Sequence, residues 1–144
     1  MTHGPKPKMA INEAWRIASG RGPVLDLSRV RGFPGDLLLL DGSRLVFIRV
    51  RRSRTHACEP RDIEMLFKET ILELRTVPQN PAIVREIHAL ASWGVWQYFR
   101  IDNDRVTEIH RDGMPFLPAG SAPVPGTPAR DKVPGTGGAG MSIS

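Results

Sequence analysis

The chain has 144 residues, which suits one domain and is long enough to bury a core without disulfides or structural metals. Its formal net charge is +5, and 16 of its 20 basic residues are arginine. A single cysteine excludes an internal disulfide, the first residues lack the apolar segment of a secretory signal, and no apolar stretch approaches the ~20 residues of a membrane span, so we expect a cytoplasmic protein with no membrane partner.

Composition divides the chain into three segments. Residues 1–8 are polar with Gly and Pro, and residues 117–144 are rich in Pro, Gly, Ala and Ser with almost no large apolar side chains. Such segments cannot bury enough surface to offset the entropy of the chain. We therefore expect a folded domain over residues 9–116 between two disordered ends.

The first expected elements are a helix over residues 9–19 and a strand over residues 23–30. Ala10, Ala14 and Ala18 recur at helical spacing on one face. The stretch PVLDLSRV that follows alternates weakly between apolar and polar residues, which favours a strand.

Two strands over residues 37–40 and 45–50 are expected to form a hairpin, because Asp-Gly between two apolar runs is a strong turn signal. The four consecutive leucines of the first strand predict burial on both faces and a central place in the sheet. In the second strand, alternation directs Arg49 and Arg51 away from the face of Ile48.

Two helices and two strands are expected after the hairpin. A helix over residues 60–77 carries apolar residues at helical spacing. Asn80 followed by Pro81 is typical of a helix start, which predicts a second helix over residues 81–92. Residues 95–101 and 106–110 alternate as strands. The whole order predicts a mixed α/β domain with helices packed on a small sheet.

The hairpin carries short motifs of a known nuclease superfamily. Pro34-Gly35-Asp36 precedes the first strand, and FIRVRRSR (47–54) stands where such proteins often read Phe-Ile-Glu-Val-Lys-Arg-Ser-Arg. With the order of elements, these motifs resemble the PD-(D/E)xK nuclease superfamily, in particular its archaeal Holliday junction resolvase-like endonuclease domains. The resemblance covers about residues 9–110 and implies a restriction-endonuclease-like core, a small mixed sheet flanked by helices.

The resemblance places Asp36 at the first metal-binding carboxylate, Arg49 at the glutamate position and Arg51 at the lysine position. The chemistry requires at least two carboxylates, because Mg²⁺ is a hard cation that prefers oxygen ligands. A guanidinium cannot ligate a metal and keeps its proton at any relevant pH. We therefore expect ion pairs of Asp36 with Arg49 and Arg51 in place of a metal site, and hence an inactive nuclease-like domain without a cofactor.

The alternative is an active, Mg²⁺-dependent endonuclease with a migrated carboxylate. In resolvase-like members a glutamate of the first helix assists metal binding, and Glu13 lies on the matching helix. Asp36 and Glu13 would then hold the metal, and Asp26, Glu59 and Glu64 are further candidates. The simpler interpretation of Glu13 is a solvated helix residue.

Six arginines lie close together in the sequence, and this clustering favours binding to the phosphates of duplex or branched DNA. The resolvase-like resemblance also implies a homodimer. Two other interpretations stay open: a solvated or structural basic face in a genome biased toward arginine codons, and a protein-interaction subunit that docks a partner on this face or on the helix over residues 60–77. The six candidates for nucleic-acid binding are Arg44, Arg49, Arg51, Arg52, Arg54 and Arg61.

The remaining reactive side chains give weaker signals. The four histidines and Cys58 show no metal-ligand spacing, so no zinc site is expected. Trp96, Tyr98 and Phe99 are able to stack on bases, but aromatics at alternating strand positions are more often core residues.

Overall fold

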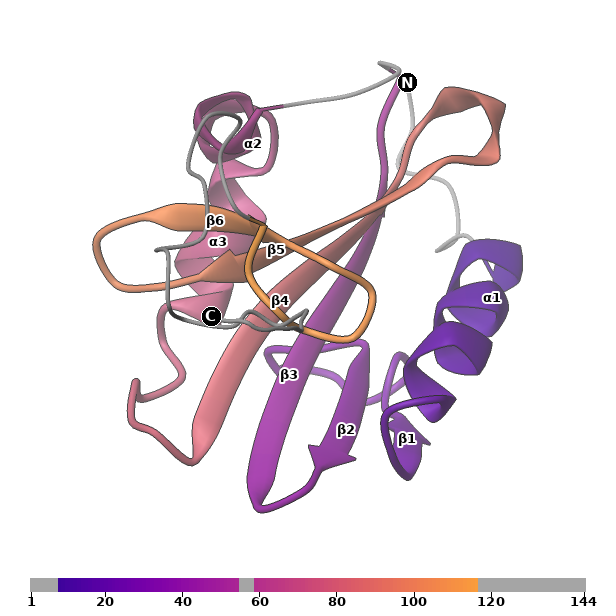
Figure 1. Cartoon of the computed structure of the whole chain (residues 1–144), viewed down its shortest axis with the longest axis vertical. Coiled ribbons are helices and arrows are strands. Elements are labelled where there is room, and N and C mark those ends of the chain that lie inside the picture. Colours follow the sequence, from indigo (N-terminus) through magenta and orange to yellow (C-terminus); the bar gives the residue numbers. More distant parts are fainter. Residues whose placement is uncertain (1–7, 55–58, 117–144) are drawn as a thin grey trace, which may run out of the picture.

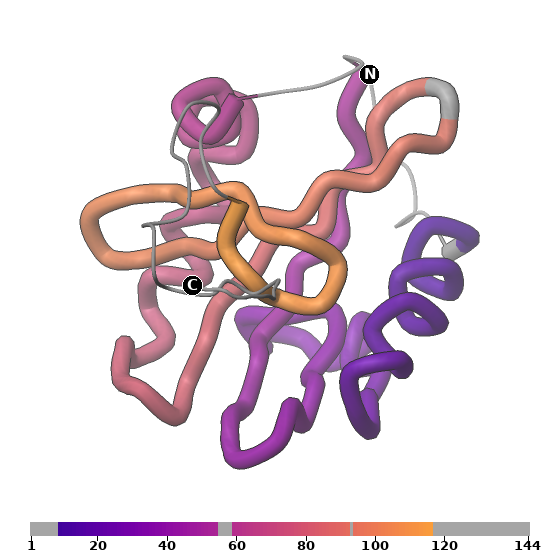
Figure 2. Tube along the Cα trace, viewed as in Figure 1, coloured from indigo at the N-terminus to yellow at the C-terminus, as the bar shows by residue number. Residues whose placement is uncertain are grey.

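A computed structural model describes residues 8–54 and 59–116, which form a six-stranded sheet with helices on both faces (Figures 1 and 2). The strands lie in sequence order from β1 to β6; β3 and β4 are parallel, and the other neighbours are antiparallel. The predicted fold class, a small mixed sheet flanked by helices, is confirmed. The elements are α1 (Lys8–Ser19), β1 (Val24–Asp26), β2 (Leu37–Asp41), β3 (Arg44–Arg52), α2 (Pro60–Leu66), α3 (Lys68–Leu74), β4 (Ile83–Leu90), the 3-10 helix η1 (Ser92–Gly94), β5 (Trp96–Ile101) and β6 (Val106–Ile109).

The helix α1 covers one face of the sheet, which we call the α1 face. Its small residues Ala10, Ala14 and Ala18 are buried, and they belong to one core cluster with Leu37 of β2 and Ile48 of β3. Small side chains let the helix backbone approach the strands closely. The helix predicted over residues 9–19 is confirmed within one residue.

The helices α2 and α3 cover the opposite face, which we call the α3 face. Ile63, Ile71 and Leu74 of these helices pack against Ile87 of β4 and Phe99 of β5. Figure 1 shows α1 on one side of the sheet and α2 with α3 on the other. The two clusters make a core with one layer on each side of the sheet.

The hairpin of β2 and β3 forms as predicted. Gly42 follows β2 with a φ of 63°, in the left-handed region that favours glycine, and Asp41 pairs with Arg44 across the turn. Leu37 pairs with Ile48, so the register places the preceding Asp36 opposite Arg49 on the α3 face. The hairpin therefore sets the positions of the residues that the sequence indicated as a site.

The prediction that β2 is a central strand buried on both faces is wrong. Leu37 and Leu39 are fully buried on the α1 face, but Leu40 is 42% exposed on the other. β2 adjoins the edge strand β1, and the central strands are β3 and β4. The core cluster beneath α2 and α3 extends from β3 to β6 and leaves the α3 face of β2 uncovered.

The helix predicted over residues 81–92 is wrong, since this segment forms β4. Asn80 does not cap a helix: its Oδ1 accepts a hydrogen bond from the Ala82 N–H at 2.8 Å in the turn before the strand. Val84 and Ile87 have helical spacing, but β4 is buried on both faces, and such a strand lacks the polar–apolar alternation that would mark it. Pairing with β3 on one side and β5 on the other decides its structure.

The helix predicted over residues 60–77 is divided into α2 and α3. The division lies at Phe67, whose backbone (φ −119°, ψ 39°) is not helical. At this break Phe67 packs against the core cluster of the α3 face. The buried apolar residues of α2 and α3 keep helical spacing across the break. The periodicity of the sequence therefore did not reveal the break.

The remaining strands agree with the sequence to different degrees. The strands predicted over residues 95–101 and 106–110 are confirmed as β5 and β6, whereas the strand predicted over residues 23–30 shrinks to the three residues of β1.

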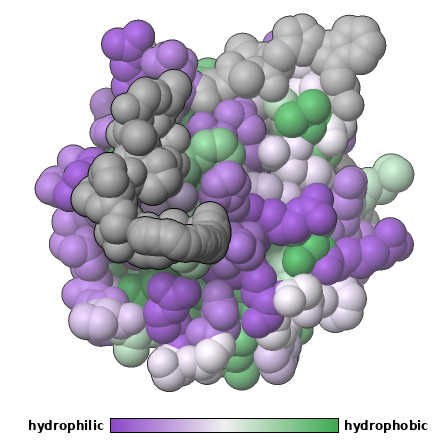
Figure 3. Space-filling view, viewed as in Figure 1, coloured by the Kyte–Doolittle hydropathy of each residue, from purple (hydrophilic) through white to green (hydrophobic). Residues whose placement is uncertain are grey.

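The surface seen in Figure 3 is largely hydrophilic, with small separate apolar areas. Within the described ranges, no helix has the length and apolar character needed to cross a membrane.

Candidate functional site

Asp36 stands immediately before β2, and backbone hydrogen bonds hold it there. Its N–H donates to the carbonyl of Ile48 at 2.7 Å, and its carbonyl accepts from the N–H of Leu27 at 2.8 Å. Its side chain is fully buried, with 0% exposure. A buried carboxylate requires partners for its charge, and the neighbouring strand supplies them.

Both carboxylate oxygens of Asp36 are bonded to groups of β3. Oδ1 accepts a hydrogen bond from Arg49 Nη1 at 3.1 Å. Oδ2 accepts from the Val50 backbone N–H at 2.9 Å and from Arg51 Nη1 at 3.2 Å. The ion pairs of Asp36 with both arginines, expected from the sequence, are present.

Helix α3 completes what we call the Asp36 cluster: Asp36, Arg49, Arg51, Thr70 and Glu73. Glu73 Oε1 lies 3.3 Å from Arg49 Nη2 and 4.0 Å from Arg51 Nη2, and Thr70 Oγ1 accepts a hydrogen bond from Arg51 Nε at 2.9 Å. Burial lowers the pKa of Arg51, and the negative charge of Asp36 opposes this effect. Two guanidiniums and two carboxylates sum to zero, so the cluster is neutral as it stands.

The Asp36 cluster does not fit a divalent metal ion. Mg²⁺ requires several oxygen ligands in close contact, whereas each oxygen of Asp36 already accepts a hydrogen bond from a guanidinium. Two fixed positive charges at this distance would repel a dication. In the part of the chain that the structure describes, no three Asp, Glu, His or Cys side chains gather into a metal-binding group.

The structure does not bring Glu13 to Asp36. Glu13 is exposed on α1, and this helix packs on the α1 face, whereas Asp36 lies on the α3 face. The sheet therefore separates the two carboxylates of the hypothetical metal pair. The other candidates, Asp26, Glu59 and Glu64, are also exposed, and none of them belongs to the Asp36 cluster.

The six arginines do not form one patch. Strand alternation places Arg49 and Arg51 on the α3 face, and Arg44 and Arg52 on the α1 face. Arg44 and Arg52 are the first and last residues of β3, which places them roughly 26 Å apart at 3.3 Å per residue. In a strand, successive side chains point to opposite faces, and the extended backbone separates its two ends. Arginines that are close in the sequence are therefore not close in space.

A groove at the end of β3, which we call the β3-end groove, contains two of the exposed arginines. Its volume is about 490 Å³. The Ser53 N–H donates to the Leu90 carbonyl at 2.9 Å and ties the end of β3 to the end of β4 beneath it. Within the described residues, neither Arg52 nor Arg54 has an ion-pair partner. The groove is lined by Arg52, Ser53, Arg54, Leu90, Ala91 and Ser92.

Arg61, the last of the six arginines, stands near the start of α2. Its side chain is 85% exposed and pairs only loosely with Glu59, at 3.3 Å from Nε to Oε1. Figure 1 shows α2 and the end of β3 at the same end of the molecule. Arg61 therefore lies at the same end of the molecule as Arg52 and Arg54, on a helix that covers the opposite face of the sheet from Arg52.

Sequence reasoning missed a buried charged network on the α1 face, which we call the Arg21 network. Arg21 donates to both oxygens of Glu86, at 2.9 and 3.1 Å, and to Asp41 Oδ2 at 3.1 and 3.0 Å. His88 Nε2 lies 2.9 Å from Glu86 Oε1. Burial opposes ionisation of Glu86, but the hydrogen bonds from His88 and Arg21 outweigh it and lower the pKa to about 2.

The signal for this network was the spacing of Glu86 and His88. In a strand, residues two apart share a face, but the segment was interpreted as a helix, in which they diverge. Gly113 lies directly over the network, because a Cβ built on it would be 2.7 Å from Arg21 Nη2. A glycine at this position leaves room for the guanidinium.

The aromatic residues of β5 belong to the core. Phe99 is fully buried and Tyr98 is nearly so. Trp96 packs against the core cluster of the α1 face, and the Tyr98 ring meets the His88 ring edge-on at 4.9 Å. This agrees with the core interpretation and leaves base stacking without support here. His56 and Cys58 lie outside the described residues.

No family model and no curated protein matches the sequence. Among solved structures, the chain is similar to Hjc, a Holliday junction resolvase from the archaeal hyperthermophile Archaeoglobus fulgidus. The two share 13% sequence identity with a TM-score of 0.40, over 74% of this chain and 85% of the other. A similarity of this degree concerns the arrangement of the backbone, and it assigns neither a family nor an activity to this chain.

Proposed function

We propose that the chain is a nuclease-like domain that binds nucleic acid without cleaving it by metal-dependent chemistry. The state of Asp36 carries this proposal. Each of its oxygens is bonded to an arginine of β3, and the second carboxylate of the cluster, Glu73, pairs with those same arginines. Metal-assisted phosphodiester hydrolysis needs a cation that bridges the enzyme and the phosphate, and at Asp36 such a cation would have to compete with a guanidinium for either oxygen.

The β3-end groove supports the binding half of the proposal. Guanidinium groups bind phosphate oxygens in pairs of hydrogen bonds, and Arg52, Arg54 and Arg61 are exposed at one end of the molecule. Arg49 and Arg51 are held by Asp36, and Arg44 lies at the opposite end of β3. The proposed contact surface therefore keeps three of the six arginines, and its ligand is duplex or branched DNA.

The main test is a titration of fluorescent duplex and four-way-junction DNA with the full chain at two salt concentrations, with and without Mn²⁺. We expect an anisotropy increase that weakens at the higher salt, and intact DNA on a denaturing gel. Mn²⁺-dependent nicking that is lost in Asp36→Ala would instead establish the endonuclease hypothesis.

A matched pair of variants locates the binding surface. R52Q/R54Q removes both charges of the β3-end groove, and R105Q removes one exposed charge from the turn between β5 and β6. We expect the first to weaken binding about tenfold or more and the second to change it little. A loss of binding free energy in R52Q/R54Q that is only twice the loss in R105Q would show that binding follows net charge alone.

A second candidate function is the docking of a protein partner on α2 and α3. Met65, Leu66 and Leu72 expose large apolar side chains on these helices, and exposed apolar clusters often mark interaction sites. Absence of salt-dependent DNA binding in the main test would favour this function. Sedimentation of the purified chain tests the homodimer that the resolvase resemblance implies.

A further inference from the structure

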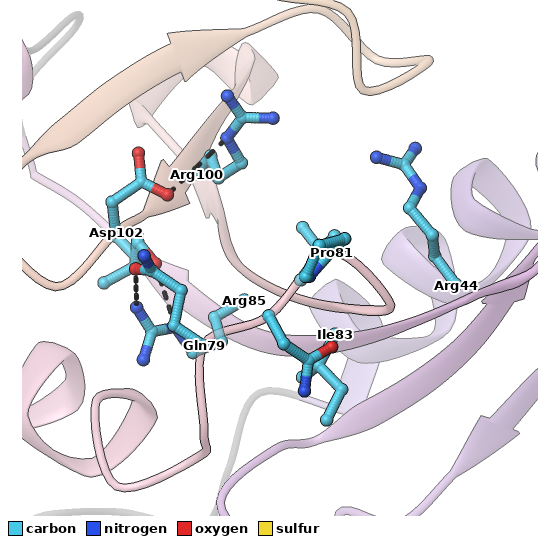
Figure 4. A pocket seen from close by; sticks show the side chains of 10 residues that line it. Arg44, Gln79, Pro81, Ile83, Arg85, Arg100 and Asp102 are labelled. Atoms are coloured by element: carbon cyan, nitrogen blue, oxygen red, sulfur yellow. Dashed lines mark hydrogen bonds and ion pairs between the residues drawn. The ribbon is translucent and has the colours of Figure 1, made fainter.

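A second hollow with arginines on its wall lies at the other end of the sheet, where β3 and β4 begin and β5 ends. Its volume is about 490 Å³. Figure 4 shows the guanidinium groups of Arg44, from β3, and Arg100, from β5, on the same side of Pro81. We call it the Arg44–Arg100 pocket. Its polar lining includes Arg44, Gln79, Asn80, Arg85, Arg100 and Asp102.

The two guanidiniums of this pocket are weakly paired. Arg44 Nη2 lies 3.6 Å from Asp41 Oδ2, an oxygen that already accepts two hydrogen bonds from Arg21. Arg100 Nε lies 3.9 Å from Asp102 Oδ1 and is a buried nitrogen without a hydrogen-bond partner among the described residues. Both distances exceed those of a hydrogen bond. The side chains keep 39% and 33% exposure, so both remain partly accessible to a ligand although Arg100 Nε itself is buried.

The amide side chains of the pocket also present donors. Gln79 Oε1 accepts hydrogen bonds from Arg85 Nη2 at 3.0 Å and from the Asn103 N–H at 2.7 Å. Asn80 Oδ1 accepts from the Ala82 N–H at 2.8 Å. Since internal groups occupy both oxygens, the NH₂ groups are what these amides offer to a ligand.

The charge of the pocket favours a dianion. Arg44, Arg85 and Arg100 contribute three positive charges, and Asp102 contributes one negative charge. Arg85 itself is buried and donates to the carbonyls of Ile101 and Val77. It therefore adds positive electrostatic potential to the pocket without contacting a ligand. A phosphate monoester carries nearly two negative charges at neutral pH and three acceptor oxygens.

We propose that the Arg44–Arg100 pocket binds a phosphate monoester, with the two guanidiniums on the phosphoryl oxygens. The apolar side chains of Pro81 and Ile83, also in the lining, would contact the group that the phosphate carries. The phosphate belongs either to a free mononucleotide or to the 5′ end of a strand. This site lies roughly 26 Å from Arg52 along β3 and does not depend on the β3-end groove.

Calorimetric titration of the full chain tests the proposal with four probes: 5′-AMP, adenosine, and a short single strand with and without a 5′-phosphate. We expect binding that requires the phosphate. Binding of 5′-AMP identifies the mononucleotide as a sufficient ligand, and binding of the phosphorylated strand alone identifies the strand end. Equal binding with and without the phosphate, or no binding of any probe, overturns the proposal.

Variants separate this site from the proposed nucleic-acid surface. R44Q and R100Q should each weaken phosphate-dependent binding about tenfold or more, R100K less, and R105Q little. R52Q/R54Q should leave it unchanged, so a failure of duplex binding and a failure of this pocket give different results. Thermal unfolding of R100Q checks that the fold is intact. Undiminished binding in both R44Q and R100Q contradicts the assignment.

Discussion

The residue-scale feature on which the proposed function depends is the pair of arginines two positions apart on β3. Either side chain alone would leave one oxygen of Asp36 without a guanidinium partner. Together with Glu73 they form a neutral group, and the cost of burying Asp36 is met by charge-assisted hydrogen bonds. Asp36 is thus part of an internal ion-pair cluster.

Asp36→Asn tests how much this cluster contributes to the stability of the fold. The substitution removes the main counter-charge of two arginines that are largely buried, so we expect the free energy of unfolding to fall by about 3 kcal/mol. Urea unfolding at neutral pH measures the loss. Asp104→Asn, at a side chain that is 80% exposed, serves as the control with an expected change within about 0.5 kcal/mol. Similar losses in both variants would refute the role of Asp36.

A second residue-scale prediction concerns the double variant R49E/R51K. It gathers carboxylates around Asp36 and should be less stable than the wild-type chain without metal, because like charges repel in a buried site. Mn²⁺ binds the folded form of such a site and should raise its melting temperature. Differential scanning fluorimetry with and without Mn²⁺ measures this effect. An equal rise in the wild-type chain would show that the arginines do not exclude the metal.

At the scale of elements, the Arg21 network connects three parts of the chain that are distant in sequence. Arg21 follows α1, Asp41 ends β2, and Glu86 lies within β4. Their side chains meet because α1 and the strands of the α1 face pack together around them. The network is a polar link beside the apolar core cluster of the α1 face.

The network predicts a specific loss of stability in acid. The pKa of Glu86 falls from 4.5 to about 2 on folding. A lowered pKa in the folded state means that the stabilisation is complete above pH 4.5 and disappears as the pH falls toward 2. The shift corresponds to about 3 kcal/mol. Urea unfolding from pH 6 to pH 2 should show a smaller decline in Glu86→Gln than in the wild-type chain, and parallel curves would contradict this account.

At the scale of the whole molecule, the arginines proposed to bind anions lie at opposite ends of β3. Arg52 and Arg54 line the groove at one end, and Arg44 lines the pocket at the other. Arg52, Arg54 and Arg61 are exposed and have no amide side chains around them in the groove lining, which suits an extended polyanion.

The salt dependence of DNA binding counts the contacts of this surface. If Arg52, Arg54 and Arg61 each neutralise one phosphate, the logarithm of the binding constant should fall against the logarithm of salt concentration with a slope of about −3. In R52Q/R54Q the slope should move toward about −1. Anisotropy titrations at four salt concentrations measure both slopes. A steeper slope that the double variant leaves unchanged would place the contacts elsewhere.

Several features were determined by the sequence alone. The small-residue stripe of α1, the Asp-Gly turn and the alternation of β3 are local signals, and they correctly predicted the first helix, the hairpin and the face shared by Asp36, Arg49 and Arg51. Because these three residues share a face and a guanidinium stays charged, the sequence also predicted the ion pairs of Asp36 with Arg49 and Arg51. Local patterns succeed here because each of these elements buries one face in an apolar core and presents a face of different composition on its other side.

Tertiary structure alone decided the identity of β4 and the distribution of charge around it. A segment buried on both faces carries no alternation, so only pairing with β3 and β5 distinguishes it from a helix. Once it is a strand, Glu86 and His88 share a face and join Arg21. The length of β3 separates Arg44 from Arg52, and the sheet itself separates Glu13, on the α1 face, from Asp36, on the α3 face.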